Sequence, residues 1–156
     1  MLRSLLLLAL LLPAICYSRT VATPFTEGEP VEISAGERLG LFQQCSRQAP
    51  QPEEILGNPT AAEVRELEPL LERYLAVVYE AGKAAPPTAT YARQYVAYRV
   101  GTRRKIYGNF FPRALANEAR RKEIAVAVCD GGPAFWGVVY DPLSKQFEQL
   151  ELNGPR

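Results

Sequence analysis

The chain has 156 residues, of which 47% are hydrophobic and 22% are charged, a composition that is typical of a folded globular protein and excludes wholesale disorder. The 18 basic and 17 acidic residues nearly cancel. No strong overall field would therefore steer the chain onto nucleic acid or anionic lipid, and we expect no nucleic-acid partner.

The N-terminus has the pattern of a signal peptide covering residues 1–18. Arg3 precedes the leucine-rich run Leu5–Leu12, and small residues near Ser18 fit a cleavage site directly after it. The apolar run is shorter than the roughly 20 residues that span a bilayer, so we expect no transmembrane segment in the mature chain. The alternative is a lipoprotein anchored at Cys16. Both alternatives predict a secreted or periplasmic protein.

Removal of the signal peptide would change the charge balance and the number of cysteines. Residues 1–18 contain one charged residue, Arg3, so removing them leaves 17 basic and 17 acidic residues. Cys16 also leaves with the signal peptide. The two remaining thiols would most simply pair in an oxidising compartment, which predicts a Cys45–Cys129 disulfide. Two buried free thiols are the alternative.

The mature chain has the length of a single domain. Residues 19–59 are predicted to form an irregular N-terminal segment of that domain, with a short strand at Val31–Ile33. Residues 60–156 are predicted to form a helix and a sheet.

A helix is predicted to begin at Thr60, because Thr60-Ala61-Ala62-Glu63 has the spacing of a capping box. Gly82 would end the helix. Pro69 lies inside it and predicts a kink or two abutting segments. Apolar residues recur at three- and four-residue steps and form one stripe: Val64, Leu67, Leu71, Tyr74, Leu75 and Val78.

Beyond a loop at Pro86-Pro87, the hydrophobic pattern changes from helical to alternating. Tyr91–Val100 and Arg103–Phe111 are predicted strands joined by Gly101-Thr102, which suits a two-residue turn. A short helix is expected over Arg113–Lys122. Three more strands are predicted, and they are Ile124–Val128, Phe135–Tyr140 and Phe147–Leu152. The fold class is therefore α+β, with the helix on an antiparallel meander sheet of about four to five strands.

This outline resembles the cystatin and NTF2-like superfolds in architecture, and architecture does not carry function. The cystatin inhibitory motif Gln-x-Val-x-Gly is not met, because Tyr98 stands at the Gly position after Gln94 and Val96. No inhibitor residue is carried over. The C-terminal stretch with Cys129-Asp130-Gly131-Gly132 and Trp136-Gly137-Val138-Val139-Tyr140-Asp141-Pro142 is similar to small secreted bacterial proteins of no assigned function. That resemblance implies a secreted origin and no activity.

The chain contains no histidine. This excludes Ser-His-Asp and Cys-His catalysis and every histidine-containing zinc site, and two cysteines cannot complete a thiolate-only zinc site. We predict no metal, no cofactor and no catalytic residue. Carboxylates are the remaining catalytic possibility, since glycosidases use two of them roughly 5–10 Å apart. The acids in question are expected to be solvated on the helix (Glu63, Glu66, Glu68, Glu72) or to shape turns (Asp130, Asp141).

Charge is distributed unevenly. Residues 91–122 hold nine basic residues and one acid, whereas residues 19–90 hold eleven acids and six bases. The turn at Gly101-Thr102 sets a register in which Val100 opposes Arg103, Arg99 opposes Arg104, Tyr98 opposes Lys105 and Val96 opposes Tyr107. Opposed residues share a face of the sheet. The predicted core face holds Val96, Tyr98, Val100, Tyr107 and Phe111, and the other face holds Tyr95, Arg99, Arg104, Ile106 and Phe110.

Two arginines that face each other across strands repel unless a negative group lies between them. Either the helix or residues 27–37 supply a glutamate, or an external partner does. In the second case an acidic protein surface or an anionic envelope component would dock on the tentative binding residues, which are Tyr95, Arg99, Arg103, Arg104 and Lys105. The predicted function is a non-enzymatic binding or inhibitory module. The alternatives are a carboxylate-based cell-wall glycan hydrolase and a structural envelope protein.

Overall fold

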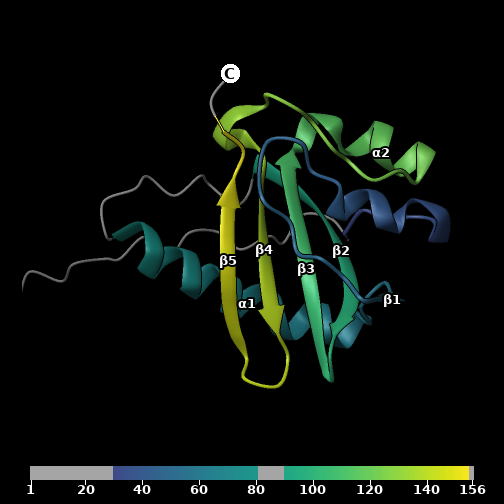
Figure 1. The fold of residues 1–156 in the computed structure, drawn as a ribbon. Coiled ribbons are helices and arrows are strands. Elements are labelled where there is room, and N and C mark those ends of the chain that lie inside the picture. The colour runs from purple at the N-terminus through teal and green to yellow at the C-terminus, as the bar shows by residue number, and fades with distance from the viewer. Residues whose placement is uncertain (1–29, 81–89, 155–156) are drawn as a thin grey trace, which may run out of the picture.

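The computed structural model describes residues 30–80 and 90–154 (Figure 1). The predicted signal peptide, the predicted helix stop at Gly82 and the Pro86-Pro87 loop lie outside the described residues. The fold is α+β, as predicted, with helices packed on a five-stranded antiparallel sheet in the order β1–β2–β3–β4–β5.

The sheet is a meander in which each strand pairs with the next one in the chain. Its strands are β1 (Glu54–Gly57), β2 (Tyr91–Val100), β3 (Arg103–Pro112), β4 (Trp136–Asp141) and β5 (Gln146–Leu152). The α-helices are α1 (Ala61–Glu80) and α2 (Ala116–Lys122), and the 3-10 helices are η1 (Ala35–Phe42), η3 (Arg113–Leu115) and η4 (Gly132–Ala134).

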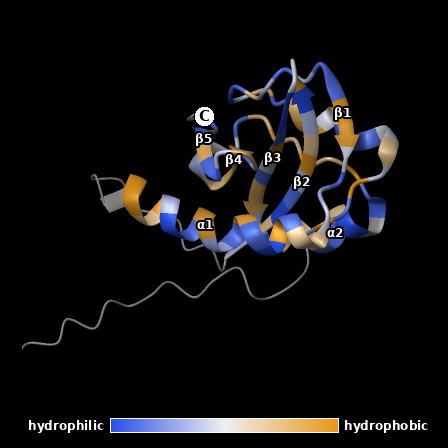
Figure 2. Cartoon of the chain, turned by 90° about the horizontal axis from the view of Figure 1, so that it is seen from below, coloured by the Kyte–Doolittle hydropathy of each residue, from blue (hydrophilic) through white to orange (hydrophobic). Residues whose placement is uncertain are grey.

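Helix α1 begins with the predicted capping box. The backbone N–H of Thr60 donates to Oε2 of Glu63 at 2.8 Å, and the backbone N–H of Glu63 donates to Oγ1 of Thr60 at 3.2 Å. The helix runs without interruption through the exposed Pro69, which rules out the second of the two predicted alternatives, two abutting segments. Hydrophobic and hydrophilic stretches alternate along α1 where it lies on the sheet (Figure 2). The apolar stripe is buried there, with Leu67, Leu71 and Leu75 at its centre.

The strands β2 and β3 pair in the predicted register, in which Arg99 faces Arg104 and Tyr98 faces Lys105. The prediction of a single core face was wrong, because side chains on both faces are buried. Helix α1 covers the face that carries Tyr95, Ile106 and Phe110. Val100 was predicted to be in the core but is 40% exposed, since it is the last residue of β2, beside the turn at Gly101-Thr102.

The second face of the sheet is covered by α2 and by the described part of the N-terminal segment, residues 30–59. Phe42 of η1 packs on the rings of Tyr98 and Tyr107 at centroid distances of 5.2 and 5.5 Å. Tyr107 in turn fills the space above Gly137, where an added Cβ would lie 2.3 Å from the tyrosine hydroxyl. Buried aromatic rings therefore lie on both sides of the same strands, and Val31, Ile33, Leu41 and Phe42 of the N-terminal segment belong to the core.

Two predicted strands are absent and one strand was not predicted. Val31–Ile33 is not a strand, although the backbone N–H of Val31 donates to the carbonyl of Arg93 at 2.8 Å. Ile124–Val128 is not a strand either, because amide side chains rather than a neighbouring strand bind its backbone. The edge strand β1, Glu54–Gly57, carries no alternating pattern and was missed.

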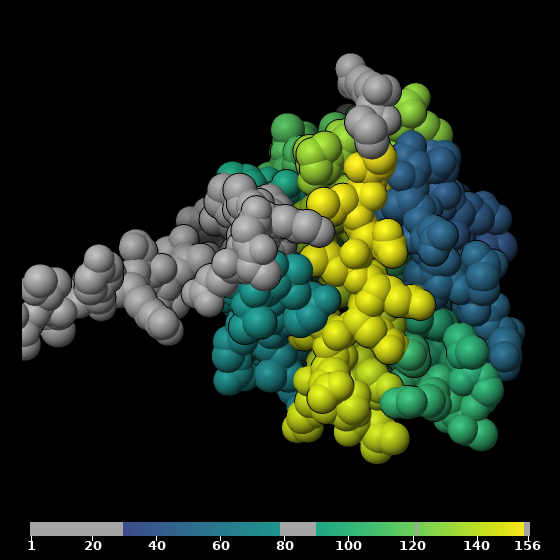
Figure 3. All heavy atoms as spheres, turned by 60° about the vertical axis from the view of Figure 1, so that its left-hand side comes forward, coloured from purple at the N-terminus to yellow at the C-terminus, as the bar shows by residue number. Residues whose placement is uncertain are grey.

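A disulfide joins Cys45 to Cys129, as predicted, with 5.3 Å between their Cα atoms. It ties the chain before β1 to the chain after α2 over a sequence separation of 84 residues. At the opposite edge of the sheet from β1, β5 contains a β-bulge at Gln149, whose φ is +52°. Figure 3 shows β5 in yellow running along the surface between α1 and the N-terminal segment.

Candidate functional site

The β2–β3 and β4–β5 turns lie at the same end of the sheet, at the bottom of Figure 1. We call this region, residues 99–105 and 141–148, the hairpin end. It contains Arg99, Arg103, Arg104 and Lys105, four of the five residues predicted to bind a partner. Its side chains are therefore the first place to look for a binding surface.

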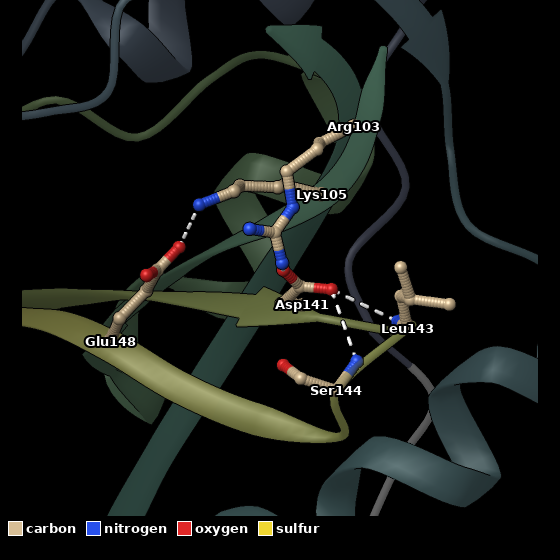
Figure 4. Close-up of polar contacts among 6 residues, drawn as sticks. All are labelled: Arg103, Lys105, Asp141, Leu143, Ser144 and Glu148. Carbon is tan, nitrogen blue, oxygen red and sulfur yellow. Dashed lines mark hydrogen bonds and ion pairs between the residues drawn. The ribbon is translucent and has the colours of Figure 1, made fainter.

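Figure 4 shows two ion pairs that cross the hairpin end. Arg103 of β3 contacts the carboxylate of Asp141, which ends β4. Lys105 of the same strand contacts Glu148 of β5. The two pairs connect three neighbouring strands, so the two turns are fixed relative to one another.

The two facing arginines pair with acids from different elements. Arg99 donates to Glu54 of β1 at 2.5 Å, and Arg104 donates to Glu63 of α1 at 2.8 Å. The helix thus supplies one partner, as expected, whereas the other comes from β1 and not from residues 27–37. With these pairs, the repulsion between Arg99 and Arg104 is compensated within the chain.

The fifth predicted binding residue, Tyr95, is not part of this surface. It is 4% exposed and lies under α1, where its hydroxyl donates to Glu68 at 3.4 Å. Arg93 donates to the same carboxylate at 2.6 Å. Burial, together with the negative charge of Glu68, raises the pKa of Tyr95 well above its usual value, so the phenol stays protonated.

Asp141 organises the β4–β5 turn. Its side chain is only 5% exposed, and Oδ1 accepts the backbone N–H groups of Leu143 and Ser144 at 2.9 and 3.3 Å. Burial by itself raises the pKa of Asp141, but these two hydrogen bonds and the positive charges of Arg103 and Lys105 outweigh it, so that the pKa is lowered. Asp141 is therefore ionised at neutral pH and holds the turn in one conformation.

The turn that Asp141 organises displays Leu143 to solvent. Leu143 is 85% exposed, the highest exposure among the large hydrophobic side chains of the described residues. Val100 on the neighbouring turn is 40% exposed. Lys145, which lies two residues after Leu143, contacts Glu66 and so connects the turn to α1. Leu143 thus projects from a turn that is held by contacts with β3 and α1 and by hydrogen bonds within the turn.

Three of the helix carboxylates considered for catalysis serve as structural partners. Glu63 bonds Arg104, Glu66 bonds Lys145 and Glu68 bonds Arg93. The expectation that the helix glutamates are simply solvated was wrong for three of them, Glu63, Glu68 and Glu72, which are half-buried. Asp141 has the predicted turn role.

Sequence reasoning missed Leu143 and the second role of Asp141 as the partner of Arg103. The signal that was available is the Asp-Pro-Leu-Ser sequence itself, since an aspartate at the first position of a turn accepts the N–H groups that follow. The ion pairs of Arg99, Arg104 and Lys105 carried no local signal, because each joins residues more than 40 positions apart.

Comparison of the chain with protein-family models, with curated proteins and with solved structures found no match. Among the described residues, every helix is too short or too polar to cross a membrane. The geometry of the hairpin end and the sequence pattern are therefore the basis for a functional assignment.

Proposed function

We propose that this chain is a secreted or periplasmic, non-enzymatic binding module that recognises another protein through its hairpin end. The observation that carries the proposal is Leu143, which is 85% exposed on a turn fixed by the buried Asp141. Leaving a leucine in water forfeits about 1.5–3 kcal/mol of burial, and a binding partner could recover that free energy.

Because the turn is rigid, it is better suited to recognising a partner than a loop that is merely exposed. Three separate contacts hold it, namely the Asp141 cap, the pair with Arg103 and the Lys145–Glu66 pair. A binding residue that is already held in place loses little conformational freedom on association, which favours affinity. The hairpin end is therefore suited to insertion into a preformed pocket.

Arg103 indicates a second chemical feature of the proposed partner. The side chain of Arg103 is 54% exposed, and it uses one nitrogen, Nη2, for its contact with Asp141. Arginine has five N–H donors, so Arg103 retains donors for an acceptor on a partner. The partner surface would combine an apolar pocket for Leu143 with an oxygen acceptor beside it.

This geometry favours a protein surface over a strongly anionic envelope component. Arg99, Arg103, Arg104 and Lys105 each have an acidic partner within the chain. Their charges are compensated, so little net positive potential remains to attract a polyanion. A glycan hydrolase is less well supported, because Glu63, Glu66 and Glu68 are committed to ion pairs.

The proposed location rests on the signal-peptide pattern and on the disulfide, which is typical of oxidising compartments. The check is the intact mass of the exported protein. A mass that begins at Arg19 supports cleavage after Ser18, and a lipid-modified Cys16 supports the lipoprotein alternative. An uncleaved protein in the cytoplasm would contradict both.

The binding proposal is tested with the mature chain from Arg19 as bait in an extracytoplasmic extract, followed by affinity measurement on the purified captured protein. We expect Leu143→Ser to weaken binding by about 10- to 100-fold, the equivalent of one buried leucine. The matched control is Leu39→Ser, which makes the same chemical change at a leucine in η1 that is 50% exposed. The control should bind like the wild type.

Equal binding by the wild type and Leu143→Ser would overturn the assignment to the hairpin end. Release of sugar fragments from cell-wall glycan by the mature chain would instead support the hydrolase. The double reversal Arg99→Glu with Arg104→Glu is a poor probe, because it places carboxylates beside Glu54 and Glu63 and would destabilise the fold whatever the partner.

A further inference from the structure

The chain between α2 and η4 crosses the second face of the sheet without joining it as a strand. We call residues 124–130 the strap; Figure 1 shows them within the yellow-green trace that runs from α2 to η4. Residues 124–128 of the strap belong to no helix or strand, Cys129 and Asp130 form a turn, and the backbone of the strap is bound by amide side chains. Gln94 of β2 donates to the carbonyl of Ile124 at 2.7 Å and accepts the N–H of Val126 at 2.9 Å.

Two further amides continue this row along the strap. Asn109 of β3 donates to the carbonyl of Val126 at 2.9 Å, and Asn153, which follows β5, donates to the carbonyl of Val128 at 2.8 Å. The three amide residues, Gln94, Asn109 and Asn153, are between 0 and 4% exposed. They bind main-chain groups of alternate strap residues and no strap side chain. Such a row recognises an extended backbone rather than a particular sequence.

Arg47 fixes the direction in which two of these amides point. Its guanidinium donates to Oδ1 of Asn109, to Oδ1 of Asn153 at 2.6 Å and to the hydroxyl of Tyr107 at 3.2 Å. Because the cation holds each amide oxygen, each NH2 group must face the strap. The row is therefore preorganised by residues outside the strap.

Besides the bonds from the three amides, the carbonyl of Val126 accepts Nε2 of Gln44 at 3.5 Å, and Ala125 and Val126 pack on the hydrophobic clusters of the second face. All residues of the strap are half-buried or exposed. Its attachment at the C-terminal end is the disulfide between the exposed Cys45 and Cys129, next to a hydrogen bond from the N–H of Asp130 to Oγ of Ser46 at 2.8 Å. Segments with little buried apolar surface open at low free-energy cost unless something covalent restrains them.

We propose that the amide row of Gln94, Asn109 and Asn153 is a binding site for an extended peptide, and that the strap occupies it while the Cys45–Cys129 disulfide is intact. A dithiol reductant would open the site. The two electrons of the dithiol reduce the disulfide, its two protons pass to the sulfurs of Cys45 and Cys129, and the dithiol is oxidised to its own disulfide. The freed strap then moves away from the amide row, and a peptide from another chain can bind there.

The first test is amide hydrogen exchange on the full mature chain, oxidised and reduced. We expect exchange at Val126 and Asp130, whose N–H groups are bonded by Gln94 and Ser46, to accelerate about tenfold or more on reduction. The strands β2, β3 and β4 should stay protected. Unchanged protection of the strap would overturn the proposal, and so would loss of protection across the whole sheet.

The second test measures peptide binding with the strap disabled. Val126→Pro in a Cys45→Ser, Cys129→Ser background removes the N–H that Gln94 accepts, so the tethered strap competes less strongly for the amide row. The probe is a labelled peptide copying residues 123–131 with serine at the cysteine position. It should bind this variant and not the oxidised wild type.

The control peptide is the same sequence with an N-methyl group at the position of Val126. Because Gln94 would lose its donor, binding should fall about tenfold or more. Failure of the first peptide to bind, or equal binding of both peptides, would overturn the proposal. Neither outcome bears on Leu143, so the strap and the hairpin end are tested independently.

Discussion

The carboxylate of Asp141 divides its two oxygens between a turn and an arginine. Oδ1 accepts the N–H groups of Leu143 and Ser144, and Oδ2 contacts Arg103. The same side chain thus shapes the exposed leucine and ties its turn to the neighbouring strand.

We expect acid to weaken the fold through Asp141. Its pKa is lowered in the folded state, so its contribution to stability is full above the unfolded pKa of about 4 and is lost as the pH falls through the folded value. At pH 7, Asp141→Asn should lower the free energy of unfolding by about 1–3 kcal/mol. Urea unfolding at pH 7 and pH 3 measures this difference. A gap that is equally wide at both pH values would contradict the assignment.

Gly137 is a second residue whose identity the structure explains. An alanine Cβ there would lie 2.3 Å from the hydroxyl of Tyr107, whose ring is held by Phe42 and Arg47. We expect Gly137→Ala to cost about 1–3 kcal/mol, measured by thermal or urea unfolding. Gly36→Ala is the matched control, because a Cβ at Gly36 meets nothing within 4 Å. A similar loss in both variants would show that the close contact is not the cause.

At the scale of elements, the start of α1 rests on two bonds that can be separated. Oε2 of Glu63 accepts the N–H of Thr60, whereas Oε1 accepts Arg104. Burial raises the pKa of Glu63, but the bonds from Thr60 and the Arg104 charge outweigh it and lower the pKa. One residue therefore caps the helix and docks it on the hairpin end.

We expect Thr60→Ala to lower stability by about 1 kcal/mol, the usual value of an N-cap. Glu63→Gln keeps an acceptor for the cap and loses the charge facing Arg104, so it should cost less than Glu63→Ala. The free energies of unfolding of the three variants, compared with the wild type, provide the check. If Glu63→Gln costs as much as Glu63→Ala, the charge rather than the cap dominates.

The elements that could be predicted are those whose pattern is local. The stripe of α1 and the β2–β3 turn at Gly101 follow from spacing within a few residues, and both agree with the structure. Ile124–Val128 also alternates, but its backbone is bound by Gln94 and Asn109 rather than by a strand. A periodic pattern shows that a segment is extended and cannot show what binds it.

The candidate site could be predicted only in part, for a similar reason. The register placed Arg99, Arg103, Arg104 and Lys105 correctly, because a two-residue turn determines it. Their acidic partners come from β1, α1, β4 and β5, and no short-range pattern connects them. Tyr95 was placed on the correct face, but the sequence did not show that α1 covers that face.

At the scale of the molecule, the disulfide closes most of the domain into one loop. We expect Cys45→Ser with Cys129→Ser to lower the free energy of unfolding by about 2–4 kcal/mol, because the unfolded chain gains freedom over 84 residues. A domain of ordinary stability remains folded after such a loss. Urea unfolding of the variant against the oxidised wild type measures the change. An unaltered midpoint would contradict this account.

The bulge at Gln149 has a consequence for solubility. The sheet has two edges, and β1 spans only four residues, whereas β5 spans seven and lies open along the surface in Figure 3. An open edge of that length is a template on which a further chain could add its own strand and begin a fibril. Gln149, with its φ of +52°, interrupts the regular spacing of hydrogen-bonding groups midway along β5. The bulge thus protects the protein, at high concentration, from aggregating through the edges of its sheet.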